Sequence, residues 1–154
     1  MWLVISLPAA AILGGIATIV IATRTSDGLV ADDYYKQGLA INQTIARDDA
    51  ARQMGLVAVL EMGDGGVRVR LDSRASAPLP EHLVLTLVHP TRSGEDQQVI
   101  LARRGAVYAG ALHVPSAGRW QIRIEDEFNN WRMSGIAQFP DDSIVTIDSD
   151  VPGS

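Results

Sequence analysis

The stretch Leu56–Asp72, which reads LVAVLEMGDGGVRVRLD, decides the fold class of this chain. Its two halves are separated by a glycine-rich turn at residues 63–66. In the second half, apolar side chains at 67, 69 and 71 alternate with charged side chains at 68, 70 and 72. A period of two is typical of a half-buried strand, and a short glycine-rich connection is typical of a hairpin. The stretch therefore predicts the start of an antiparallel β-domain.

Further strands follow at intervals marked by Gly, Pro and Asn. We expect them at His82–His89, Gln97–Arg103, Ala106–Val114, Arg119–Asp126 and Trp131–Phe139. Trp120, Ile122 and Ile124 are predicted to face inward, and Asn129-Asn130 is predicted to form a hairpin turn. Seven short strands of this kind indicate an Ig-like antiparallel β-sandwich, to which Ile144–Ile147 could add an edge strand.

The N-terminal run Trp2–Thr23 carries no Asp, Glu, Lys, Arg or His. Its length corresponds to about 33 Å of helix, enough to cross a hydrocarbon core of roughly 30 Å. We therefore predict one transmembrane helix, retained rather than cleaved, because no Ala-x-Ala site follows. Small residues recur every four positions at Ala10, Gly14, Thr18 and Ala22, which favours packing against a partner helix; the alternative is a lone anchor.

A second helix is expected over Asp33–Met54, with Asp32 as its N-cap and Gly55 as its stop. We interpret Arg47, Asp48 and Asp49 as solvated charges on its distal half. One interpretation has this helix packing on its own domain, with Tyr34 and Tyr35 as interfacial anchors. The other is a docking surface beside a membrane partner, which a mid-helix glycine at Gly38 favours.

These features divide the chain into four segments: a transmembrane helix (1–24), a juxtamembrane segment and helix (25–55), a β-domain (56–139) and an acidic tail (140–154). The 154 residues carry a net charge of −5 and no Cys. The lack of Cys excludes disulfides and thiolate sites, and the lack of a basic run argues against nucleic-acid binding.

No motif of nucleophilic catalysis, phosphate binding or dinucleotide binding occurs in the sequence. We therefore predict a protein that is not an enzyme, with no cofactor and no small-molecule substrate. The carboxylate run Glu125-Asp126-Glu127 is interpreted as a solvated loop at a strand end, because acid–base work needs a cleft.

Copper or another soft metal would need thioether or imidazole ligands. The candidates are Met54, Met62, Met133, His82, His89 and His113. No two of them form a tight motif, and His82 and His89 are predicted to point to opposite faces of a strand. We expect packing roles for all six, and no metal site.

The juxtamembrane run DDYYKQGLAIN at Asp32–Asn42 resembles the signature of the FixH/CcoH family. His89-Pro90-Thr91-Arg92 and the run AGRWQIRI at Ala117–Ile124 also match that family's β-domain pattern. The resemblance extends to about Phe139. It implies an N-terminal membrane helix, a small periplasmic β-domain and a role with cbb3-type cytochrome c oxidase, as an assembly factor or accessory subunit.

The resemblance also implies a bacterial inner-membrane location with the N-terminus in the cytoplasm, alongside a copper-transporting P-type ATPase and other assembly factors. The Lys and Arg distribution points the other way, because Arg24 and Lys36 follow the helix and no Lys or Arg precedes it. The residues expected to bind partners are Ala10, Gly14, Thr18, Ala22, Tyr34, Tyr35, Lys36, Gly38, Leu39 and Asn42. Two alternatives remain: a periplasmic copper chaperone that supplies the oxidase, and an anchored scaffold with no respiratory link.

Overall fold

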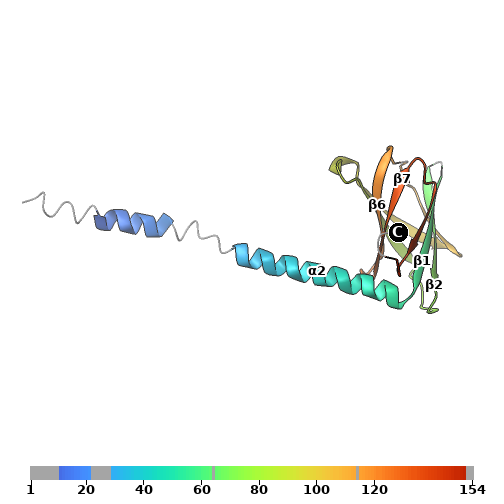
Figure 1. Ribbon diagram of the computed structural model, residues 1–154, viewed down its shortest axis with the longest axis horizontal. Helices are drawn as coiled ribbons and strands as arrows, with labels where there is room; N and C mark the ends of the chain where they lie inside the picture. The colour runs from blue at the N-terminus through green and yellow to red at the C-terminus, as the bar shows by residue number, and fades with distance from the viewer. Residues whose placement is uncertain (1–10, 22–28, 64, 114, 152–154) are drawn as a thin grey trace, which may run out of the picture. The chain divides into compact units, whose positions relative to one another are not determined.

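The computed structural model describes residues 11–21, 29–63, 65–113 and 115–151 (Figure 1). The chain divides into two compact units, residues 1–40 and 41–154. Residues 11–21 are helical, and within them the Thr18 hydroxyl donates to the Gly14 carbonyl at 2.9 Å. Among the described residues, no helix is both long enough and apolar enough to cross a membrane. The predicted span Trp2–Thr23, with Ala10 and Ala22, extends outside the described residues and stays a prediction.

Helix α2 covers Leu29–Gln53 and ends in a turn at Met54 and Gly55. Gly55 has a φ of +56°, so the predicted glycine stop is confirmed. The predicted N-cap at Asp32 is wrong, because the helix is already formed at Leu29. Leu and Ala are strong helix formers, and residues of this kind before Asp32 extend the helix by most of a turn.

The β-domain contains eight strands. They are β1 (Leu56–Gly63), β2 (Gly66–Ser73), β3 (His82–Val88), β4 (Gln97–Arg104), β5 (Val107–Gly110), β6 (Gly118–Asp126), β7 (Arg132–Phe139) and β8 (Ile144–Asp148). A short 3-10 turn, Ser93–Glu95, lies between β3 and β4. The expected strands are all present, the strand expected over 106–114 is shorter, and the edge strand near the C-terminus is confirmed.

All eight strands belong to one antiparallel sheet in the order β7-β6-β3-β4-β5-β2-β1-β8. Strands β3 to β6 form a Greek key, because β6 returns beside β3. The two edge strands, β7 and β8, approach each other, so the sheet curves almost into a barrel. The predicted Ig-like sandwich of two sheets is therefore wrong, although the antiparallel β class is confirmed. Alternation and turn residues are the same in both architectures and cannot distinguish them.

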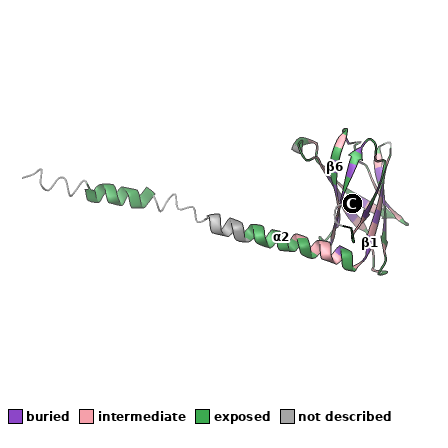
Figure 2. Cartoon of the chain, viewed as in Figure 1, coloured by how far each residue is buried: buried purple, intermediate pink, exposed green. Residues whose placement is uncertain are grey.

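The core lies inside this curved sheet, where alternate residues of each strand point inward (Figure 2). Trp120, Ile122 and Ile124 are fully buried, as predicted. Two aromatic side chains keep their polar atoms satisfied: Trp120 Nε1 donates to the Ser116 carbonyl at 2.9 Å, and the Tyr108 hydroxyl donates to the Pro80 carbonyl at 2.7 Å. Burial raises the pKa of the Tyr108 hydroxyl, so it remains a donor at neutral pH.

The C-terminal edge is fastened by an exposed cluster of charges. Arg74, just after β2, pairs with both Asp148 and Asp150. The Asp150 amide donates to Asp148 Oδ1 at 3.0 Å. This backbone hydrogen bond, together with Arg74, holds the pKa of the Asp148 carboxyl below its ordinary value.

A substitution at Gly110 tests how β5 packs against β4. A Cβ added at Gly110 would lie 2.6 Å from Leu101 Cδ2 and 3.2 Å from the Ile100 carbonyl oxygen. Gly110→Ala should therefore lower the free energy of unfolding by about 1–3 kcal/mol in urea denaturation of the full chain. Gly63→Ala is the matched control, since nothing lies within 4 Å of its added Cβ. Equal stabilities for the two variants would contradict the described packing.

We expect the cluster of Arg74, Asp148 and Asp150 to make the protein less stable in acid. Because folding lowers the pKa of Asp148, this group stabilises the fold above its unfolded pKa of about 3.9. That contribution is lost as the pH falls from there through the lower folded pKa. Urea denaturation from about pH 6 to about pH 3 should show a smaller acid loss in Asp148→Asn than in the natural chain. Identical acid losses would show that the cluster contributes nothing.

Candidate functional site

The exposed part of α2 carries apolar side chains. Leu39, Ile41 and Ile45 are 48%, 59% and 49% exposed. Figure 2 shows this stretch in the exposed colour before the helix becomes partly buried near its end. A helix whose apolar residues remain exposed has either a partner or an aggregation liability. The helix therefore contains a candidate binding surface.

We call Ile41, Ile45 and the polar Asn42 beside them the α2 stripe. At about 100° per residue they lie on one side of the helix, whereas Arg47 and Ala51 lie roughly opposite. Ala51 is buried in the domain core, and Arg47 contacts β6. Asp48, which pairs with Arg132 of β7, lies only about 20° around the helix from Ile41, so the α2 stripe is exposed because it precedes the part of the helix that contacts the sheet. This exposure argues against the interpretation that this part of the helix packs on its own domain.

The other predicted partner-binding residues lie as follows. Lys36, Gly38 and Leu39 are exposed, and nothing lies within 4 Å of a Cβ added at Gly38. Gly38 precedes Ile45 by seven residues and so shares its side of the helix. Tyr34 and Tyr35 belong to the helical backbone, but their side chains lie outside the described part, as do Ala10 and Ala22. Gly14 and Thr18 are exposed on the helix of residues 11–21.

The distal half of α2 is held to the sheet by two ion pairs. Arg132 of β7 donates to both carboxylate oxygens of Asp48, at 2.9 and 3.0 Å. Arg47 Nη1 donates to Glu125 Oε1 of β6 at 3.2 Å. Glu125 and Arg132 are cross-strand neighbours, so the four charges alternate in sign. The interpretation of Arg47 and Asp48 as solvated charges is wrong, because their partners lie about 80 residues away in sequence.

Asp49 differs from its neighbours. It pairs with Arg52 on the same helix, and both side chains are nearly half exposed. The expectation of a solvated charge is confirmed at this position alone. The helical period of the sequence could have distinguished Asp49 from Arg47 and Asp48, because residues 47, 48 and 51 share the side of α2 that meets the sheet.

Two carboxylates of the predicted run at the end of β6 are structural rather than solvated. Glu125 is 9% exposed and Asp126 is 3% exposed. Asp126 accepts hydrogen bonds from the Asn130 amide at 2.6 Å, the Trp131 amide at 3.1 Å and Asn130 Nδ2 at 2.7 Å. These bonds close the predicted Asn129-Asn130 turn, where Asn129 has a φ of +57°. The solvated-loop interpretation is therefore wrong for Glu125 and Asp126, whereas Glu127 is exposed, as that interpretation expected.

Two sequence motifs of the β-domain meet at the end of β3. The His89 ring lies edge-on to Trp120, with ring centroids 5.0 Å apart. A Cβ added at Gly118 would lie 3.1 Å from His89 Nε2, and Gly118 has a φ of +142°. His89 Nδ1 accepts the Thr91 amide at 3.2 Å, which places the ring proton on Nε2. The run around His89 and the run around Trp120 thus form one packed unit.

The adjoining loop is held by hydrogen bonds to Ser116. Its hydroxyl donates to Glu95, and this bond is the largest cause that lowers the pKa of the Glu95 carboxyl. Arg92 contacts both Glu95 and Ser116. The arrangement gives these polar residues a structural role.

The candidate soft-metal ligands are dispersed. Met133 is buried in the core, Met54 packs against it, and His82 Nδ1 lies 3.0 Å from Glu127 Oε2. Within the described part of the chain, no three His, Cys, Asp or Glu side chains are grouped to hold a metal ion. Met62 and His113 do line one cavity of about 160 Å³ beside Leu112 and Phe139. Its lining is mostly apolar.

Comparison with known proteins places the chain in a family. The FixH family model matches residues 1–138, which is most of the sequence. The chain belongs to the FixH family. The match includes the juxtamembrane block, the α2 stripe and strands β1 to β6 with nearly all of β7. The search of curated proteins found no match, and neither did the search of solved structures.

A double-mutant cycle tests how α2 is fastened in this FixH protein. Asp48→Ala and Arg132→Ala should each destabilise the full chain, with a coupling energy of about 1–3 kcal/mol, because the pair is bidentate and partly buried. The control cycle uses Asp49→Ala and Arg52→Ala, an exposed pair on one helix, with an expected coupling below about 0.5 kcal/mol. Equal couplings in urea denaturation would contradict a special role for Asp48.

Proposed function

We propose that this protein is a non-catalytic, single-span membrane protein that associates with a cbb3-type cytochrome c oxidase, as an assembly factor or a small accessory subunit. Membership of the FixH family over residues 1–138 supports this proposal. The observation that carries it is the α2 stripe, because Ile41 and Ile45 remain exposed on the part of the helix that precedes its contact with the β-domain. An apolar helix side of this kind gains stability when a partner covers it.

The proposal places the protein in the bacterial inner membrane, with the N-terminus in the cytoplasm and the β-domain in the periplasm. The uncharged run Trp2–Thr23 has the length needed to cross a bilayer. Orientation here follows the family, against the weak indication from Arg24 and Lys36. A copper-transporting P-type ATPase and other assembly factors are proposed neighbours.

We propose contacts with the partner on two helices. Small residues at Gly14 and Thr18 allow a partner helix to approach closely within the membrane. The α2 stripe and Gly38 then provide a second contact on the juxtamembrane helix. Gly38 fits this role because no described atom lies within 4 Å of its added Cβ, so a partner backbone could approach there.

Co-purification tests the proposed surface. Ile41→Ser combined with Ile45→Ser should lower recovery of the haem-containing oxidase with the tagged full chain by about tenfold or more, because the buried apolar area is lost. Gly14→Leu with Tyr35→Ala should also weaken it, through the membrane helix and the juxtamembrane block. Ile144→Ser is the control, since Ile144 is 62% exposed on β8 and lies outside the proposed surface. Unchanged recovery in both test pairs would remove the surface from consideration.

A copper chaperone that supplies the oxidase is the second candidate. Its support is that Met62 and His113 line the same cavity, which pairs a thioether with an imidazole. Copper(I) should then bind the full chain in detergent at micromolar concentration, and Met62→Leu with His113→Ala should abolish binding. Binding that survives these changes, or no binding at all, would reject this candidate.

A further inference from the structure

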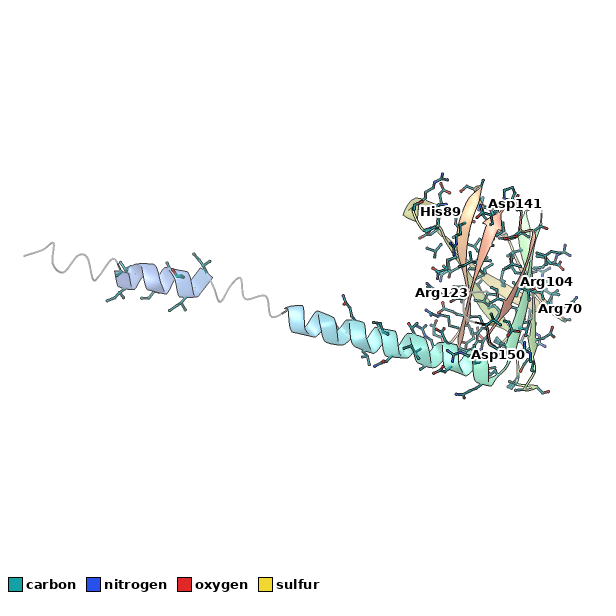
Figure 3. All side chains as sticks on the ribbon, viewed as in Figure 1. Arg70, His89, Arg104, Arg123, Asp141 and Asp150 are labelled. Atoms are coloured by element: carbon teal, nitrogen blue, oxygen red, sulfur yellow. The ribbon has the colours of Figure 1, made fainter. Side chains whose placement is uncertain are left out.

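The outer side of strands β2, β5 and β4 gathers arginines that are far apart in the sequence. In register, Val69, Tyr108 and Arg103 lie in one row across the three strands. Gly105 lies in the turn between β4 and β5. The next row toward that turn therefore contains Arg70, Val107 and Arg104. Their side chains point to the opposite side of the sheet from Val69. Figure 3 shows Arg70 and Arg104 together on this side of the β-domain.

A parallel row lies two residues away, with Arg68 on β2, Ala109 on β5 and Ala102 on β4. Neighbouring strands are about 4.8 Å apart, so Arg70 and Arg104 arise about 10 Å from each other across Val107. Arg68 and Arg70 arise about 7 Å apart along β2. We call these three arginines, with the floor of small side chains between them, the arginine face.

Within the described residues, the guanidinium groups of Arg68, Arg70 and Arg104 have no ion-pair or side-chain hydrogen-bond partner, and all three residues are exposed. Two carboxylates border the face, Glu61 opposite Arg68 and Asp72 at the far end of β2. The face keeps an excess of positive charge in a chain whose net charge is −5.

The floor of the arginine face is apolar, which is unusual for the solvent side of an antiparallel sheet. That side normally carries polar residues. Here the outward residues of β4 and β5 between Gln98 and Arg104 are apolar, namely Ile100, Ala102, Val107 and Ala109, and Ile100 is 66% exposed. The small side chains leave the arginine stems and the floor accessible to a flat partner surface.

This combination indicates the chemistry of the occupant. A guanidinium fork binds carboxylates or phosphates in two parallel hydrogen bonds. Arginine beside apolar residues is characteristic of protein interfaces, in which lysine is depleted, whereas membrane-surface and nucleic-acid patches also rely on long basic runs. The arginine face is small and is not part of a long basic run, so carboxylates of a protein fit it better than a lipid surface.

We propose that the arginine face docks an acidic segment of a protein partner, with Asp or Glu side chains on Arg68, Arg70 and Arg104 and apolar side chains on the floor. The site is separate from the α2 stripe and lies on the sheet itself. This inference rests on the proposed function to the extent that the partner is taken from the oxidase complex.

Charge reversal tests the inference in the full membrane-anchored chain. Combined Arg68→Glu, Arg70→Glu and Arg104→Glu should lower co-purification of the haem-containing oxidase by about tenfold or more. Arg70→Glu alone should lower it more than the matched control Arg119→Glu, which changes an exposed arginine on β6. Thermal unfolding of each variant checks that the fold is retained, since all four side chains point to solvent.

A photocrosslinker placed at Val107 identifies the occupant directly. We expect an adduct with a protein segment rich in Asp or Glu, lost in the triple variant. An adduct with phospholipid alone, an adduct with a segment that lacks carboxylates, or unchanged recovery of the triple variant would overturn the inference. Failure of the natural chain itself to co-purify with the oxidase would instead reject the proposed function, so the two failures are distinguishable.

Discussion

The ion pair between Asp48 and Arg132 is the interaction on which the arrangement of this protein depends. It joins helix α2 to strand β7 through two hydrogen bonds, while Arg47 and Glu125 add a second bond to β6. Ala51 completes the contact by entering the core. Because these residues fix the end of the helix on the sheet, the preceding Ile41 and Ile45 remain exposed.

The charges of this contact are only partly screened by solvent. Arg132 is 18% exposed and Asp48 is 33% exposed at the side chain, so each would be costly to leave without its partner. Alternating signs across Glu125 and Arg132 on neighbouring strands reduce repulsion within the cluster. The contact between α2 and the sheet is therefore specific as well as stabilising, which suits the proposed role of this helix in binding a partner.

Local patterns in the sequence were sufficient to predict every strand and the end of α2. Alternation marked β2, and Gly55 marked the helix stop because the chain there needs a positive φ. The single curved sheet was not predictable, since strand neighbours such as β1 and β8 are set by pairing across about 90 residues. The partners of Arg47 and Asp48 were missed for the same reason.

The arginine face could not be predicted from the sequence for the same reason. Arg68 and Arg70 are neighbours on one strand, but Arg104 joins them only because β5 lies between β2 and β4. The sequence contains no basic run, which argued against nucleic-acid binding, and the three arginines are brought together only by the pairing of the strands. The juxtamembrane block was easier to recognise, because a helix keeps residues that are close in sequence close in space.

Because the chain contains no Cys, a single introduced thiol can report on the α2 stripe without interference. The most direct measurement is thiol labelling of Ile45→Cys in native membranes that contain or lack the cbb3-type oxidase, with Ile144→Cys as the exposed reference. The account predicts that Ile45→Cys is protected only when the oxidase is present, while Ile144→Cys is labelled equally in both membranes. Equal labelling of Ile45→Cys in the two membranes would contradict it.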